Sequence, residues 1–244
     1  MPAIRFAHVC KSFGSRVVLD DVSFDVPAAT AFCLLGRSGT GKSVALRHMI
    51  GLTRPDSGQV FVESNDLASL ARPALTALRV RMGYLFQGAA LFDSLSVGEN
   101  VAFPMQRHTD WTPAEIRSRA EQKLDEVGLA GEYDAMPADL SGGMRKRAGL
   151  ARALALDPPI LLVDEPGAGL DPVTAAEVDA LLLETKRRGT TLVVVTHDIP
   201  GARAIGDGFG VLHEGRLLVS GAIGALDASD EPMVQAFMRS RGGG

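Results

Sequence analysis

The chain has 244 residues, 46% hydrophobic and 22% charged, which is typical of a folded protein and excludes a wholly disordered one. Its 25 basic residues are outnumbered by 29 acidic ones, so a general nucleic-acid-binding surface is not expected. Cys10 and Cys33 lie too far apart for a zinc motif and indicate a reduced compartment. The apolar stretches, such as residues 26–36, are far shorter than a membrane span, and no secretory segment follows Met1. We therefore expect a cytoplasmic protein that reaches a membrane only through a partner.

The first third of the chain predicts short strands and one helix. Alternation at Ile4, Phe6 and His8 and the apolar runs at 17–19 and 22–24 are typical of strands. The continuous apolar run 31–35 ends in a glycine-rich turn, and residues 44–50 then predict a helix. A further strand is expected at 59–62, after a turn containing proline and glycine.

Residues that typically begin and end helices are frequent from about residue 91 to 155. Thr112, Pro113 and Glu115 form a capping-box pattern, and Gly128 is a suitable stop. Ser141 is expected to cap a second helix. A strand at 160–164, a helix from 172 to about 188 and a strand at 191–196 follow. This alternation predicts an α/β fold with a mainly parallel sheet and a helical insertion.

Residues 36–43 match the phosphate-binding pattern G-x-x-x-x-G-K-[ST] between the predicted buried strand and helix. Such a loop points backbone amides at phosphate oxygens. Lys42 would neutralise the β- and γ-phosphates, and the Ser43 hydroxyl would bind Mg²⁺. The residues expected to bind ATP here are Gly36, Arg37, Ser38, Gly39, Thr40, Gly41, Lys42, Ser43 and Val44.

Two acids follow the predicted strand 160–163. An acid at the carboxyl end of a parallel strand opens toward the crevice where ligands bind. Asp164 is expected to hold Mg²⁺ through water, and Glu165 to orient the attacking water. These two motifs alone would support any P-loop NTPase.

The segment Leu140-Ser141-Gly142-Gly143-Met144 resembles the signature of ATP-binding cassette (ABC) proteins. Phosphate loop, Gln87, signature, acidic strand, Gly169-Leu170-Asp171 and His197 follow one another in the order of that family. The resemblance implies one nucleotide-binding domain over residues 1–244, with a RecA-like P-loop NTPase core and an N-terminal antiparallel β subdomain. The core would comprise about 1–90 and 156–222, the inserted helical subdomain about 91–155, and a C-terminal tail about 223–244.

The same resemblance implies roles for further residues. Phe13 would stack on adenine, Gln87 would contact Mg²⁺ or the attacking water, and His197 would contact the γ-phosphate. Each has an ordinary alternative: a packed phenylalanine, an exposed glutamine and a structural histidine. Catalytic roles are thus expected for Glu165, His197, Gln87 and Lys42, and metal-binding roles for Ser43, Gln87 and Asp164.

The signature is expected to act across a dimer. In the family it binds the γ-phosphate held by the opposite subunit, so that two chains enclose two ATP molecules. The resemblance therefore adds four residues to those expected to bind ATP: Ser141, Gly142, Gly143 and Asp171.

Several weaker segments together resemble the ATPase subunits of Mla/MCE-type lipid transporters. They are 86–92, 100–104, 107–109, 136–137, 140–144 and 197–200. This implies a homodimer on ATP binding, a polytopic membrane permease, MCE-type and STAS-type subunits, no nucleic acid, and a place on the cytoplasmic face of the inner membrane. An ATPase for import of amino acids or another small solute, and a soluble cassette acting in translation or DNA repair, remain alternatives.

Two further expectations concern the surface of the protein. Leu91, Phe92 and Phe103 follow Gln87, where the family docks a helix of its membrane subunit, although burial inside the domain is an equal alternative. The basic run 145–147 is expected to be a solvated helix face rather than a nucleic-acid or lipid patch.

Overall fold

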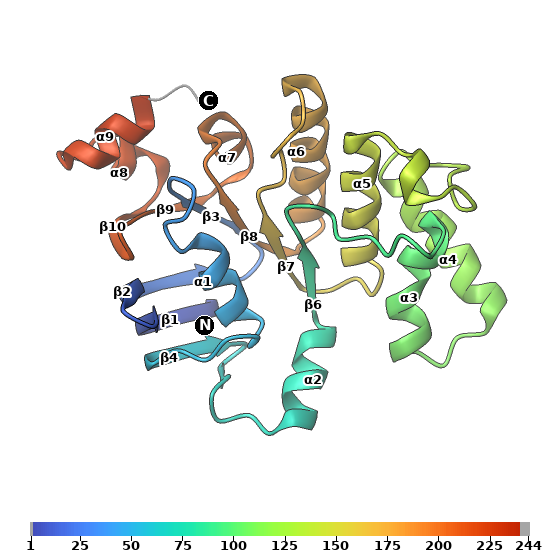
Figure 1. Ribbon diagram of the computed structural model, residues 1–244, viewed down its shortest axis with the longest axis horizontal. Coiled ribbons are helices and arrows are strands. Elements are labelled where there is room, and N and C mark those ends of the chain that lie inside the picture. Colours follow the sequence, from blue (N-terminus) through green and yellow to red (C-terminus); the bar gives the residue numbers. More distant parts are fainter. Residues whose placement is uncertain (1, 240–244) are drawn as a thin grey trace.

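Two β-sheets lie beside each other, and a lobe of helices extends from the edge of the larger sheet (Figure 1). The computed structural model describes residues 2–239. Residues 240–244 of the expected C-terminal tail lie outside the described residues.

The smaller sheet is antiparallel, in the order β2-β1-β4-β5. Its strands are β1 (Pro2–Phe13), β2 (Arg16–Pro27), β4 (Ser57–Val62) and β5 (Asn65–Asp66). The two short strands expected at 17–19 and 22–24 are one strand, because β1 pairs with β2 along its whole length. Register shifts in that pairing coincide with positive φ angles at His8 (53°) and Asp21 (55°).

The larger sheet has the order β10-β9-β3-β8-β7-β6. Its strands are β3 (Ala31–Leu35), β6 (Met82–Leu85), β7 (Ile160–Asp164), β8 (Thr191–Thr196), β9 (Gly208–His213) and β10 (Arg216–Gly221). All neighbours pair in parallel except β9 and β10, which are antiparallel. The expected α/β class with a mainly parallel sheet, an N-terminal antiparallel sheet and a helical insertion is confirmed.

The central strands are buried on both faces, which explains their continuous apolar runs. In β3, Phe32 and Leu34 face one core with the antiparallel sheet and helix α1 (Lys42–Met49). Ala31, Cys33 and Leu35 face the second core, formed with helices. Phe24 stacks between Phe6 and Phe32 at centroid distances of 4.7 and 4.9 Å, which joins the two sheets.

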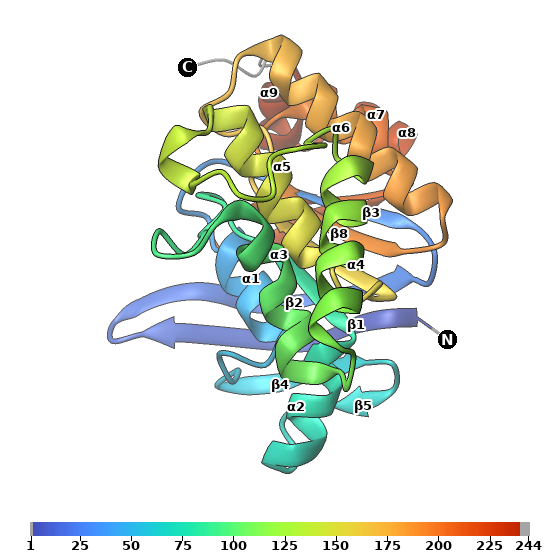
Figure 2. The same cartoon turned by 90° about the vertical axis from the view of Figure 1, so that its right-hand side faces the viewer.

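Three helices between β6 and β7 form the lobe (Figures 1 and 2). They are α3 (Val97–His108), α4 (Pro113–Glu126) and α5 (Gly142–Ala153), and a 3₁₀ turn, η1 (Pro137–Asp139), precedes α5. The predicted capping box of Thr112 and Glu115 is present at α4, and Ser141 caps α5. A second capping box, formed by Ser96 and Glu99, begins α3.

The remaining helices are α2 (Arg72–Val80), α6 (Pro172–Arg187), α7 (Ile199–Ile205), α8 (Ile223–Asp227) and α9 (Pro232–Arg239). Helix α1 begins at Lys42, two residues before the predicted start, because Gly41 adopts a φ of +105° that permits a tight turn into it. A Cβ on Gly41 would lie 2.7 Å from the Val18 carbonyl oxygen, so the loop needs glycine there. Among residues 2–239, no helix is both long and apolar enough to cross a bilayer.

Candidate functional site

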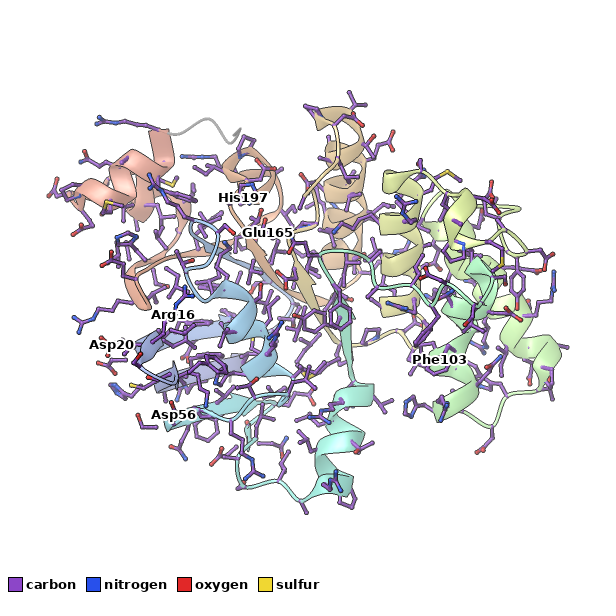
Figure 3. The ribbon with its side chains drawn as sticks, viewed as in Figure 1. Arg16, Asp20, Asp56, Phe103, Glu165 and His197 are labelled. Carbon is purple, nitrogen blue, oxygen red and sulfur yellow. The ribbon has the colours of Figure 1, made fainter. Side chains whose placement is uncertain are left out.

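The carboxyl ends of β3, β8, β7 and β6 bring much of the phosphate loop, Gln87, Glu165 and His197 to one cleft of about 380 Å³. The phosphate loop follows β3, Glu165 follows β7, and His197 follows β8. Figure 3 shows Glu165 and His197 side by side near the loop that precedes α1. The predicted residues that line this cleft are Phe13, Ser38, Gly39, Gly41, Lys42, Ser43, Val44, Gln87, Glu165 and His197. Gly36 and Arg37 instead line a small neighbouring pocket, and the Thr40 hydroxyl donates to the Arg37 carbonyl at 2.9 Å.

The Glu165 carboxylate is held from two sides. The Lys42 ammonium lies 3.3 Å from Glu165 Oε1, and His197 Nδ1 lies 2.9 Å from Oε2. The same ammonium donates to the carbonyl oxygens of Gly36 at 2.8 Å and Arg37 at 3.0 Å. Lys42 and Glu165 are both buried, so their opposite charges interact with little screening by solvent. A fixed cation and a fixed carboxylate therefore lie together at the mouth of the phosphate loop.

A hydroxyl and a carboxylate meet beside this pair. The Ser43 hydroxyl donates to Asp164 Oδ1 at 3.0 Å, and burial raises the pKa of the Asp164 carboxyl while that hydrogen bond opposes the rise. These are the oxygen donors that Mg²⁺ prefers. A single hydroxyl and a single carboxylate fit an ion whose remaining ligands are phosphate and water oxygens.

Glu165 has a strained backbone, with a φ of +47°. Its amide donates to the Val195 carbonyl at 2.9 Å, and its own carbonyl accepts a hydrogen bond from Lys146 Nζ at 3.0 Å. Lys146 also donates to the Gln87 carbonyl. The peptide units at two edges of the cleft are therefore joined by one side chain.

The expectation that residues 145–147 form a solvated face is wrong for Lys146, which is only 3% exposed. Burial lowers the pKa of Lys146 to about 8. Arg147 also turns inward, and its Nη1 donates to the carbonyls of Val127 and Gly128 at 3.2 and 3.1 Å. Arg145 is exposed as expected, whereas Lys146 and Arg147 turn inward because their long side chains satisfy backbone carbonyls of neighbouring segments.

Phe13 and Arg16 line the cleft at the β1–β2 end. Phe13 is 52% exposed, with the Lys11 ammonium 5.4 Å from its ring centre, so it is not a packed strand-end residue. Arg16 Nη2 donates to the Gly39 carbonyl of the phosphate loop at 3.1 Å. Sequence reasoning missed Arg16, and the available signal was a basic residue three positions after Phe13.

The structure does not bring the signature or Asp171 to the cleft of the same chain. The Ser141 hydroxyl accepts from the Met144 amide at 3.2 Å, and a Cβ on Gly143 would lie 2.3 Å from Thr174 of α6. Asp171 caps α6 by accepting from the amides of Val173 and Thr174 at 3.0 and 3.1 Å.

A second cavity, of about 830 Å³, lies between α6 and α7 and shares Glu165 and His197 with the cleft. Asp179 and Asp198 also line it. Burial raises the pKa of Asp179 to about 6, and the nearby Asp198 carboxylate contributes to the rise.

Comparison with known proteins places this geometry in a family. The sequence model of the ABC transporter family matches residues 19–168. The chain is 43% identical over 240 residues to the "Probable ribonucleotide transport ATP-binding protein mkl" of Mycobacterium leprae, covering 98% of this chain and 69% of that protein.

Two further relatives are 38% identical to the chain. The "Intermembrane phospholipid transport system ATP-binding protein MlaF" of Escherichia coli matches over 92% of this chain and 84% of its own length. The "Methionine import ATP-binding protein MetN 1" of Yersinia pestis matches over 97% and 71%.

The chain also has a fold similar to that of a solved structure. The dimeric cassette MJ0796, in a post-hydrolysis state bound to ADP and Pi, superimposes with a TM-score of 0.83 at 31% identity. The match covers 90% of this chain and 98% of that one.

The Asp179 carboxyl generates a pH-dependent prediction. Because its pKa is raised from 3.8 to about 6, folding disfavours the ionised form, and this cost grows as pH rises through that interval. We expect Asp179→Asn to raise the free energy of unfolding at pH 7.5 by about 1 kcal/mol, a value reduced for partial exposure. At pH 4 we expect almost no change.

Denaturant unfolding at both pH values measures this difference. Glu177→Gln, at an exposed acid of the same helix, is the matched control and should change neither value. An equal gain at pH 4 and pH 7.5 would instead assign the effect of Asp179→Asn to packing.

Proposed function

The chain belongs to the ABC transporter family and is an ATPase, and from this premise we propose that it powers phospholipid transport by a membrane complex. Hydrolysis is supported above all by the Glu165 carboxylate, held between Lys42 and His197 at the phosphate loop. The phospholipid substrate is supported by the likeness to MlaF and by the segments around Gln87 and Met144. The mkl and MetN likenesses favour a second candidate, transport of a small solute such as a ribonucleotide or methionine.

We assign the hydrolytic roles as follows. The backbone amides of the phosphate loop and Lys42 bind the β- and γ-phosphates, while Ser43 and Asp164 hold Mg²⁺, the latter through water. Mg²⁺ held by these residues would supply neutralisation of phosphate charge. Gln87, which follows β6, would contact Mg²⁺ or the attacking water, and His197, which follows β8, would contact the γ-phosphate.

Lys42 and Glu165 contact each other at 3.3 Å in the chain alone. A γ-phosphate carries more negative charge than one carboxylate, so it would draw the Lys42 ammonium toward itself. Glu165 would then retain His197 as its partner and direct its other oxygen at water. Phosphoryl transfer depends mainly on such positioning and charge neutralisation.

The proposed active unit is a homodimer that forms when ATP binds. The signature Ser141–Gly143 and Asp171 do not line the cleft of their own chain, which supports their proposed role in completing the partner's site. The signature also lies at the N-terminus of α5, where amide groups favour an anion.

A groove of about 460 Å³ is the proposed docking place for a permease helix. Phe92 is 45% exposed and contacts Phe103 at a ring-centre distance of 5.0 Å, so it is not buried as the alternative required. Buried Asn100 fixes Phe92 by accepting from its amide at 2.8 Å. Docking would place the chain on the cytoplasmic face of the membrane, with MCE-type and STAS-type subunits as further proposed partners.

Glu165→Gln should retain ATP affinity, because phosphate contacts remain, but lower the hydrolysis rate at least about a hundredfold. Nucleotide titration and steady-state phosphate release measure the two quantities. Asp164→Asn is the contrasting variant and should weaken Mg²⁺-dependent nucleotide binding. Normal turnover by the Glu165 variant would remove this residue from the proposed mechanism.

Heterodimers that carry the same two substitutions, either both in one chain or one in each chain, test whether the active site is shared. A chain carrying both Lys42→Ala and Ser141→Arg, paired with wild type, damages both composite sites, whereas one lesion in each chain leaves one site intact. We expect more ATPase activity from the split arrangement, measured on purified, differently tagged heterodimers. The reverse ranking would mean that each signature serves its own phosphate loop.

Phe92→Asp should leave the chain folded but reduce recovery of its membrane permease, because a charge replaces an apolar anchor in the groove. Leu52→Asp, at another exposed apolar residue outside the groove, is the control and should not reduce recovery. Circular dichroism checks folding.

Mass spectrometry of the wild-type complex should find bound phospholipid, and a bound small solute with no phospholipid would favour the second candidate.

A further inference from the structure

Lys146 is a buried cation. Within residues 2–239, its ammonium has no carboxylate oxygen as close as those in the ion pairs of this chain, such as Lys42 with Glu165. Its ammonium instead donates to two backbone carbonyl oxygens, those of Gln87 and Glu165. Burying an ammonium costs free energy unless its hydrogen bonds are satisfied. The two carbonyls satisfy donors of the buried ammonium, and the nearby Asp164 and Glu165 carboxylates also stabilise its charge. The Lys146 side chain in turn fixes the two carbonyls.

The two carbonyls belong to segments that follow neighbouring strands at the ATP cleft. Gln87 follows β6 and Glu165 follows β7, and both residues line the cleft. Glu165 has the left-handed φ of +47°, a conformation that persists only where surrounding contacts hold it. Its amide is fixed by Val195 of β8 and its carbonyl by Lys146, so these bonds together orient the carboxylate between them.

The same face of α5 supports the segment that follows Gln87. Arg152 donates to the carbonyls of Ala89 and Ala90, each at 2.7 Å, and these alanines have φ angles of 61° and 52°. A Cβ on Gly149 would lie 3.0 Å from that of Ala89, so the helix lies directly against this segment. Residues 146, 149 and 152 share one helix face, and of the side chains at 146 and 152 only Lys146 donates to Glu165.

We propose that Lys146 is a positioning residue of the ATPase centre, which holds the Gln87 and Glu165 peptides in register so that the Glu165 carboxylate points at the attacking water. This inference rests on the proposed role of Glu165. It also links that carboxylate to the helix that carries the signature, because Lys146 follows Ser141–Gly143 within the first turns of α5.

The test is a split between kcat and KM in the full chain. Lys146→Met keeps most of the side-chain volume but removes the donors, and we expect kcat to fall about tenfold or more while KM for ATP changes less than about threefold. Lys146→Arg, which can reach both carbonyls, should retain kcat within about threefold of wild type. Lys146→Gln keeps a donor for one carbonyl and should be intermediate, and it decides the matter if the methionine variant does not fold.

Lys186→Met is the matched control. Lys186 also donates to a backbone carbonyl, that of Ile205 at 2.8 Å, but lies away from the ATP cleft. It should lower the unfolding temperature without lowering kcat. A kcat within about twofold of wild type for Lys146→Met, or a parallel loss of kcat and ATP affinity, would overturn the positioning role.

Glu165→Gln distinguishes failure of the positioning role of Lys146 from failure of the proposed role of Glu165. Normal turnover by that variant contradicts the role of Glu165 itself. If Glu165→Gln is inactive and Lys146→Met is fully active, only the role of Lys146 is contradicted. If Lys146 acts through Glu165, adding Lys146→Met to Glu165→Gln should lower the residual rate by less than about twofold.

Discussion

Burial of β3, β7 and β8 on both faces is the constraint on which the site depends. Strands covered on both sides can carry almost no polar side chains along their length, so the polar groups emerge where the strands end. Asp164 and Thr196 are the last residues of β7 and β8, and the phosphate loop begins directly after Leu35 of β3. Because the three strands are parallel neighbours, their carboxyl ends bring Ser43 within hydrogen-bonding distance of Asp164, and Lys42 and His197 within contact distance of Glu165.

Two lysines bracket Glu165 in different ways. Lys42 interacts with the carboxylate, whereas Lys146 interacts with the carbonyl of the same residue. The first contact pairs two opposite charges, and the Lys42 ammonium can exchange the carboxylate for a more negative group that enters the cleft. The second joins a charge to a dipole on the backbone, and the Asp164 and Glu165 carboxylates also stabilise that charge. The site thus combines a contact with the carboxylate of Glu165 and a contact with its backbone.

Local chemistry made much of the fold and cleft predictable. The caps at Thr112 and Ser141, and the phosphate loop, depend on residues only a few positions apart. The contacts of Lys146 with Glu165 and Gln87 span 19 and 59 residues, and no short pattern reveals them. The left-handed conformations of Glu165 and Ala89 were also not predictable, because neither residue type favours positive φ and tertiary contacts impose it.

The close approach of Gly143 to Thr174 affects how substitutions in the signature should be interpreted. An alanine at 143 would place its methyl group 2.3 Å from Thr174 Cγ2, so the Thr174 side chain or the helix that carries it would have to shift. Inactivity of such a variant would report this displacement as much as any lost contact with nucleotide. At Gly142 the nearest atom to an added methyl group is 3.6 Å away, on Leu170. Position 142 is therefore the informative place for mutagenesis, since a side chain can be added there without disturbing the interior.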